Sequence, residues 1–353
     1  MIISDDIGSF PIPEQESREE LYDIAIKIVT KNVSFDENSR FNRIVADIMK
    51  RKIYSGIKRP TYPQIQDMIS QFFYFIERLS DDENPLVVRD EFAIIPELNS
   101  IDEVAREYYK KNNRALELRV CVTGPLELYL KRIGTLIHSD LLFNIAKSVS
   151  KFVSNSILDR DYIKTRVVSL DEPSLGLNTN LIFERDDLIE ALDIAVKPAK
   201  KLDVQIHLHS LIESDIILQT ENISIIGVES AENPSALNEI SRKELEIYDK
   251  FLRVGISRTN ILSLASDYLD KTGIDVWKEG NFDEMLNKME NIKIIGKRLN
   301  KAYSIFGNNI KYAGPDCGLG AWPSQNIAFK NLKNTASAID RFNSNLRTQF
   351  KRL

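Results

Sequence analysis

The sequence predicts an α/β protein built as a single (β/α)8 TIM barrel, and three observations support this fold class. Short β-rich runs alternate with longer segments of helical period, which is the pattern of a parallel sheet covered by helices. There are eight such runs, as a closed barrel requires, and a chain of 353 residues is long enough for one barrel with additions. We expect the strands near residues 2–7, 91–95, 118–123, 165–170, 203–208, 223–228, 251–256 and 309–312.

The segments between these strands carry the apolar spacing of helices that cover a barrel. One such apolar face is made by Leu21, Ile24, Ala25 and Ile28. The stretch at about residues 10–90 is longer than one connecting helix requires, so we expect it to form a cap or part of a substrate lid after the first strand. We find no internal repeat beyond the alternation itself, and residues 1–353 are therefore expected to form one catalytic barrel.

The composition is that of an ordinary globular protein. Hydrophobic residues make up 43% of the chain and charged residues 28%. The net charge of -5 is small and the basic residues are scattered, which argues against a nucleic-acid partner. The N-terminus lacks a signal-peptide pattern and no apolar run is long enough to span a membrane, so we expect a cytoplasmic protein without a membrane partner. The two cysteines, Cys121 and Cys317, are expected to stay reduced, with Cys121 in the core of a strand.

Three of the expected strand ends carry side chains that bind metals. Residues 205–210 (QIHLHS) end the fifth strand and place His207 and His209 two positions apart, on one face of a strand. Glu229 follows the sixth strand and Cys317 follows the eighth. Because the loops after the strands of a barrel converge on one mouth, we expect these side chains to meet there. Imidazole, carboxylate and thiolate are all zinc ligands, so the combination predicts a catalytic zinc site.

Each of these residues alone also has an ordinary structural interpretation. A histidine at a strand end is often only hydrogen-bonded, Glu229 fits a loop acid, and Cys317 fits a small buried hydrophobic side chain. What favours the metal site is the convergence of three strand ends on one mouth.

Two other strand ends offer groups that suit an amino-acid substrate. After the first strand, Gly8 permits close approach of the backbone and Ser9 offers a hydroxyl and an amide to a carboxylate, although a plain turn has the same sequence features. After the fourth strand, Asp171 and Glu172 bring two acids to the mouth. One of them could bind a substrate ammonium group, while acids at this place also complement the positive end of a helix.

Together, these segments resemble the C-terminal catalytic barrel of cobalamin-independent methionine synthase and its shorter archaeal relatives. They occur in the family order and span nearly the whole chain, and they are specific as a set. The full-length enzymes carry a second, N-terminal barrel that this sequence does not show. The matching segments are residues 6–11 (DIGSFP), 122–125 (VTGP), 171–175 (DEPSL), 207–209 (HLH), Glu229 and 315–319 (PDCGL).

The resemblance implies a zinc ion as the cofactor. The family has a His-x-Cys pair where this chain has His207 and His209, so His209 stands at the place of a thiolate. With Glu229 and Cys317, this interpretation retains four ligands. An alternative register aligns His209 with the family histidine and puts Leu211 at the cysteine position.

The resemblance also implies a substrate and a reaction. The chain would be a methyltransferase of methionine biosynthesis, and thus of amino-acid biosynthesis, that transfers a methyl group to the thiol of homocysteine. Ile7, Gly8 and Ser9 would contact the homocysteine backbone, and Asp171 would hold its amino group. Asp171 and Cys317 are the catalytic residues that this implies.

The chain departs from the family most clearly where the folate methyl donor would bind. The family tryptophan at the folate ring falls at Lys131, its arginine-cysteine pair has no counterpart in residues 92–96, and its late histidine is replaced within residues 257–260 (SRTN). These losses argue against methyltetrahydrofolate and favour methylcobalamin or a methylated corrinoid protein as the partner. Two alternatives stay open: a methyltransferase for another small thiol such as coenzyme M, and a subunit that needs a separate N-terminal-barrel protein.

Overall fold

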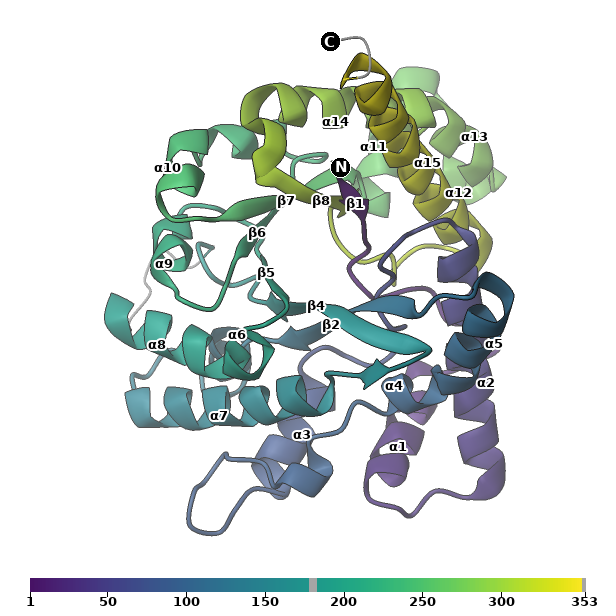
Figure 1. Cartoon of the computed structure of the whole chain (residues 1–353). Helices are drawn as coiled ribbons and strands as arrows, with labels where there is room; N and C mark the ends of the chain where they lie inside the picture. The colour runs from purple at the N-terminus through teal and green to yellow at the C-terminus, as the bar shows by residue number, and fades with distance from the viewer. Residues whose placement is uncertain (178–182, 351–353) are drawn as a thin grey trace.

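The computed structural model describes residues 1–177 and 183–350 and shows an α/β fold around a curled, mostly parallel sheet (Figure 1). The described residues form an eight-stranded sheet in the order β1, β8, β7, β6, β5, β4, β2, and β3 pairs antiparallel with β4 outside this path. The strands are β1 (Ile3–Ser4), β2 (Leu116–Thr123), β3 (Asp159–Arg160), β4 (Ile163–Asp171), β5 (Asp203–His207), β6 (Ile225–Val228), β7 (Phe251–Ser257) and β8 (Ile310–Pro315).

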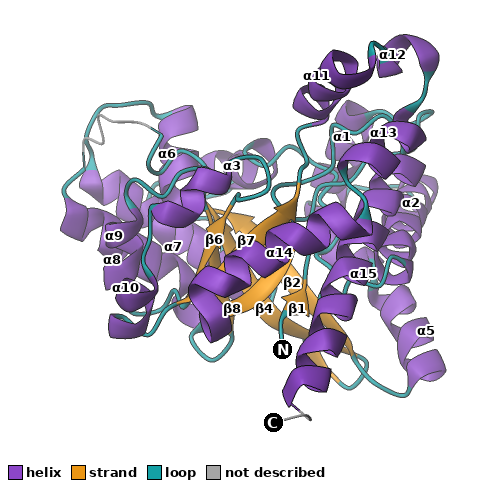
Figure 2. Cartoon of the chain, turned by 90° about the horizontal axis from the view of Figure 1, so that it is seen from above, coloured by secondary structure: helices purple, strands orange, loops and turns teal. Residues whose placement is uncertain are grey.

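The helices lie around the outside of this sheet (Figures 1 and 2). They are α1 (Arg18–Val29), α2 (Phe35–Tyr54), α3 (Ser70–Arg78), α4 (Pro96–Ser100), α5 (Asp102–Asn112), α6 (Pro125–Arg132), α7 (Ser139–Asn155), α8 (Arg185–Val196), α9 (Ser214–Gln219), α10 (Arg242–Ile247), α11 (Ile261–Thr272), α12 (Val276–Glu279), α13 (Phe282–Met289), α14 (Ile292–Phe306) and α15 (Gln325–Phe350). Short 3-10 helices are η1 (Asp90–Phe92), η2 (Lys197–Ala199), η3 (Pro234–Asn238) and η4 (Gly307–Asn309). None of the helices in the described part of the chain is both long and apolar enough to cross a membrane.

Seven of the eight expected strands are present, and the expected second strand at residues 91–95 is wrong. That region contains η1, and Pro96 then starts α4. The apolar residues there resemble a strand in composition, but proline fixes the backbone dihedral φ at a value that suits the first turn of a helix. The chain therefore enters a helix where a strand was expected.

Residues 59–61 lie between the two edge strands of the sheet instead. Arg59 forms an isolated parallel bridge with Asp5, next to β1, and Thr61 forms one with Arg119 of β2. The segment is short and contains Pro60, which has no N–H for strand pairing, so its sequence did not indicate a strand. Part of the stretch expected as a cap thus lies alongside the sheet, while α1 and α2 flank it.

Apart from the short, exposed β3, the strands are largely buried, and the side chains inside the curl change character along it. Val167, Ile225 and Tyr312 form an apolar cluster at the end of the curl where the strands begin. Further along, Arg119 and Arg253 are almost completely buried. Asp5 lies with them and accepts a hydrogen bond from Arg253 Nε at 3.0 Å. The site described next lies beyond this charged layer, where the strands end.

Candidate metal and substrate site

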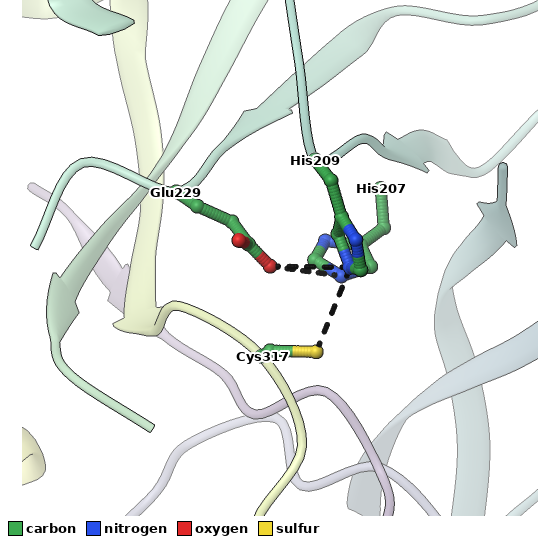
Figure 3. A group of neighbouring side chains, drawn as sticks. All are labelled: His207, His209, Glu229 and Cys317. Carbon is green, nitrogen blue, oxygen red and sulfur yellow. Dashed lines mark hydrogen bonds and ion pairs between the residues drawn. The ribbon is translucent and has the colours of Figure 1, made fainter. Parts of the chain in front are cut away.

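Four side chains that bind metals converge where β5, β6 and β8 end. One ligand atom from each of His207, His209, Glu229 and Cys317 can be chosen so that all four lie within 4.8 Å of one another. The side chains point toward a common centre (Figure 3). Glu229 Oε1 lies 3.5 Å from His207 Nε2 and 3.4 Å from His209 Nε2, and Cys317 Sγ lies 3.9 Å from His209 Nε2.

The register of the sheet explains why these residues meet. His207 is the last residue of β5 and pairs with Gly227 of β6, two residues before Glu229. His209 shares the face of His207 because side chains alternate along an extended chain. Leu211, the residue of the alternative register, is buried and outside the cluster.

The cluster is polar but poorly satisfied by protein groups. His207 Nε2 and Glu229 Oε1 are buried and have no hydrogen-bond partner among the described residues. Burial lowers the pKa of both histidines, which keeps the imidazoles neutral and able to bind a metal. Burial also raises the pKa of Glu229 to about 8 and that of Cys317 to about 12. Neutral imidazole nitrogens, a carboxylate and a sulfur directed at one point are the ligand chemistry of zinc, so the residues fit that ion.

The cluster borders a cavity of about 500 Å³. His207, His209 and Cys317 contribute to one side of the cavity, and Ile7, Ser9 and Asp171 also line it. These residues come from the ends of different strands, so the cavity opens at the end of the sheet where the strands finish.

Gly8 is not among the residues that line this cavity. Its φ is +114°, a backbone conformation that residues with a side chain rarely adopt, and a Cβ there would lie 3.1 Å from Cys121 Sγ. The carbonyl of Gly8 accepts a hydrogen bond from Lys52, which is fully buried and forms an ion pair with Asp6 at 2.7 Å. Gly8 therefore shapes the turn between Ile7 and Ser9.

The two adjacent acids at the end of β4 have separate positions. Asp171 lines the cavity, and burial raises its pKa to about 6, against the opposing effect of Arg119. Glu172 faces away and accepts hydrogen bonds from the backbone amides of Leu126 (2.9 Å) and Glu127 (2.7 Å) at the start of α6. Glu172 thus takes the structural role at a helix start, and Asp171 is the acid that lines the cavity.

Several cavity residues were not identified from the sequence. Arg18, Gln64, Gln66 and Asp67 line the cavity and lie in the stretch that we interpreted as a cap. No local signal in the sequence marked these four residues. Trp322, by contrast, is buried and donates to the carbonyl of Thr259, so it packs beneath the Cys317 loop rather than lining the cavity.

Fold and site together define an α/β protein with a candidate metal centre where its parallel strands end. No protein-family model matches the chain, and no curated protein matches it. Among solved structures, a B12-independent methionine synthase from Shewanella sp. W3-18-1 in complex with selenomethionine is similar over 100% of both chains, with 14% identity and a TM-score of 0.62. A putative vitamin-B12-independent methionine synthase from Listeria monocytogenes is similar over 97% of this chain and 99% of that chain, with 13% identity and a TM-score of 0.58. These likenesses show a shared fold.

Proposed function

We propose that this chain is a zinc-dependent methyltransferase that transfers a methyl group to the thiol of homocysteine, giving methionine. One observation carries the proposal: His207, His209 and Cys317 border the same cavity as Asp171. A thiol held at the cluster would have its amino group in the cavity with Asp171. The two solved structures that share the fold are described as methionine synthases, and one contains selenomethionine, which supports this assignment.

The proposed zinc ligands are His207, His209, Glu229 and Cys317. When bound, zinc would lower the pKa of the substrate thiol and present it as a thiolate nucleophile. Two neutral imidazoles leave this site less negative than a site with two thiolates, which favours an anionic substrate sulfur. Because burial disfavours the ionised forms of Glu229 and Cys317, a bound cation would compensate the cost of their charges.

The cavity residues would orient the amino acid. We assign Asp171 to the substrate ammonium group, because its carboxylate is held by a hydrogen bond from Ser169 Oγ at 3.1 Å and lines the cavity. Ile7 and Ser9 would contact the backbone atoms of the substrate, with Gly8 supplying the turn between them. Fixing both ends of homocysteine would position its sulfur to attack the methyl group and displace the donor as the leaving group.

We propose methylcobalamin or a methylated corrinoid protein as the methyl donor. The position of the family's late histidine offers no free acid or base here: Arg258, in that segment, is paired with Glu232 and with Asp267, the latter at 2.7 Å. Lys131, at the position of the family tryptophan, pairs with Glu127 at 3.7 Å.

We further propose that the fold is a (β/α)8 barrel in which residues 59–61 take the place of the second strand. A cytoplasmic location would suit such an enzyme.

A reconstituted assay tests the function. The zinc-loaded chain is incubated with homocysteine and either methylcobalamin or methyltetrahydrofolate, and methionine is measured by mass spectrometry. We expect methionine with methylcobalamin and none with the folate. Replacing homocysteine by coenzyme M tests the other thiol. Failure of the isolated chain to form methionine with excess methylcobalamin would contradict the proposal and favour the subunit alternative.

A further inference from the structure

Arg18 is the only lysine or arginine among the described residues that line the cavity. Its guanidinium is held by backbone carbonyls: Nη1 donates to Ile65 (2.8 Å), and Nη2 donates to Gly320 (3.1 Å) and to Phe10 (3.4 Å). No carboxylate of the described residues lies within 4.0 Å of it. Carbonyl oxygens fix the position of the guanidinium without cancelling its positive charge.

Gln64 supplies a second hydrogen-bond donor on the cavity wall. The residue is only 6% exposed, and its Nε2 has no hydrogen-bond partner among the described residues. A buried amide without a partner costs free energy unless a ligand supplies the missing acceptor. Gln64 lines the same cavity as Arg18.

Cys121 sets the orientation of this amide. Its Sγ lies 3.7 Å from Gln64 Oε1. Burial raises the pKa of Cys121 to about 12, so the group is a thiol that donates its proton to the amide oxygen. With the oxygen directed at Cys121, the nitrogen is the end of Gln64 that is free for a ligand.

Ser9 connects the two donors. It forms an isolated parallel bridge with Gln64, and its hydroxyl accepts a hydrogen bond from the Gly320 amide at 3.3 Å. The carbonyl of the same Gly320 accepts from Arg18. Arg18, Gln64 and Ser9 therefore belong to one corner of the cavity, contributed by a different part of the chain from Asp171.

We propose that Arg18 and Gln64 form a carboxylate subsite, which makes the site specific for thiols that are also α-amino acids. This inference rests on the proposed function and extends it from the thiol to the anionic end of the substrate. A guanidinium and an amide N–H are the groups that bind a carboxylate through charge-assisted hydrogen bonds. Asp171 and this corner would then read the two opposite charges of one amino acid.

Three ligands distinguish recognition of the carboxylate from recognition of the amino group. Homocysteine carries both, aminopropanethiol has the same thiol and amino group without the carboxylate, and mercaptobutyrate has the thiol and carboxylate without the amino group. Their dissociation constants are measured by calorimetry on the full zinc-loaded chain, so the readout does not depend on methyl transfer.

The variants are Arg18→Met, Arg18→Lys and Gln64→Glu, with Asp171→Asn as the matched control at the opposite end of the ligand. We expect Arg18→Met and Gln64→Glu to weaken homocysteine and mercaptobutyrate by roughly 10- to 100-fold, and to leave aminopropanethiol unchanged or bound more tightly. Arg18→Lys keeps the charge and should retain part of the affinity. Asp171→Asn should weaken homocysteine and aminopropanethiol but not mercaptobutyrate.

The results separate this inference from the proposed function. If Arg18→Met and Gln64→Glu bind homocysteine as tightly as the wild-type protein does, the carboxylate subsite is wrong and the proposed function stands. Equal losses for all three ligands would also overturn the subsite, because they indicate general damage to the cavity. If the wild type binds none of the three thiols, the proposed function itself fails. Thermal unfolding of each variant shows whether Arg18→Met still folds, and Gln64→Glu supplies the test if it does not.

Discussion

The carboxylate of Asp316 occupies the space in which a side chain at Gly255 would lie, since a Cβ at that glycine would overlap Asp316 Oδ1. In this position Asp316 accepts hydrogen bonds from the backbone amides of Ala231 (3.0 Å) and Glu232 (2.7 Å). These amides follow Glu229, and Asp316 precedes Cys317. One buried carboxylate thus fixes two of the proposed ligands relative to each other, and it depends on a glycine in a third strand.

Replacing Gly255 by alanine should therefore weaken metal binding. The added methyl group displaces Asp316, at a cost of about 1–3 kcal/mol in stability, and loosens the loop of Glu229. We expect zinc affinity to fall by roughly 10-fold or more, as is usual when the groups that orient ligands are lost. Competition with a chelator measures the affinity. The control is Gly296→Ala in α14, where a Cβ meets no atom within 4 Å, and equal zinc affinities for the two variants would contradict the argument.

His209 provides the direct test of the ligand set. Because the side chain of His209 is 37% exposed, against 5% for His207, its removal should cost little stability. His209→Ala should lose most of the bound zinc, whereas His209→Cys supplies a thiolate and should keep it. Metal content is measured after dialysis against a zinc-buffered solution. Unchanged zinc content in His209→Ala would show that the fourth ligand lies elsewhere.

Asp171 and Glu172 should respond differently to the same isosteric change. Asp171→Asn removes the charge in the cavity, so we expect weaker homocysteine binding with little change in the melting temperature. Glu172→Gln replaces one of the two oxygens that accept backbone amides at the start of α6 by a donor, so we expect lower stability, by about 1–3 kcal/mol. Calorimetry and thermal unfolding measured on both variants separate the two roles. Lower stability in Asp171→Asn together with weaker homocysteine binding in Glu172→Gln would contradict this assignment of roles.

Glu97 predicts part of the pH dependence of stability. It is fully buried, accepts two hydrogen bonds from Gln66 Nε2 (2.9 and 3.1 Å), and burial raises its pKa from 4.5 to about 7. An acid with a higher pKa in the folded state takes up protons on folding. The stability that Glu97 contributes is therefore fully present below its pKa in the unfolded chain, and it is lost as the pH rises from there through about 7.

Glu97→Gln should remove this dependence. From about pH 5 to about pH 8, the free energy of unfolding of the variant minus that of the wild type should rise by about 2–3 kcal/mol, the amount that the pKa difference implies. Urea unfolding at several pH values measures it. Glu103→Gln, at an exposed position of α5, should run parallel to the wild type, and a parallel curve for Glu97→Gln would show that Glu97 is ionised in the folded protein.

Local sequence was enough to predict seven strands and the four residues of the cluster. Buried parallel strands have a distinctive composition, and the alternation of side chains along a strand fixes the face that His207 and His209 share. Because the ends of parallel strands meet at one edge of a sheet, Glu229 and Cys317 could be placed with them without knowing any distance. The place of residues 59–61 beside the two edge strands could not be predicted, since these residues are held by isolated bridges to Asp5 and to Arg119 rather than by a strand-like sequence.

The sequence by itself thus determined the kind of fold, the strand ends and the chemistry of the cluster, because these depend on residue type and periodicity. Only the tertiary structure decided which of two adjacent acids enters the cavity, since the space beside Gly124 that accepts Glu172 exists only when β2 lies next to β4. It also decided that Arg18 and Gln64 border the same cavity as Asp171. These residues are distant in the chain and carry no shared pattern, and the packing of α1 and residues 59–68 against the strand ends brings them together.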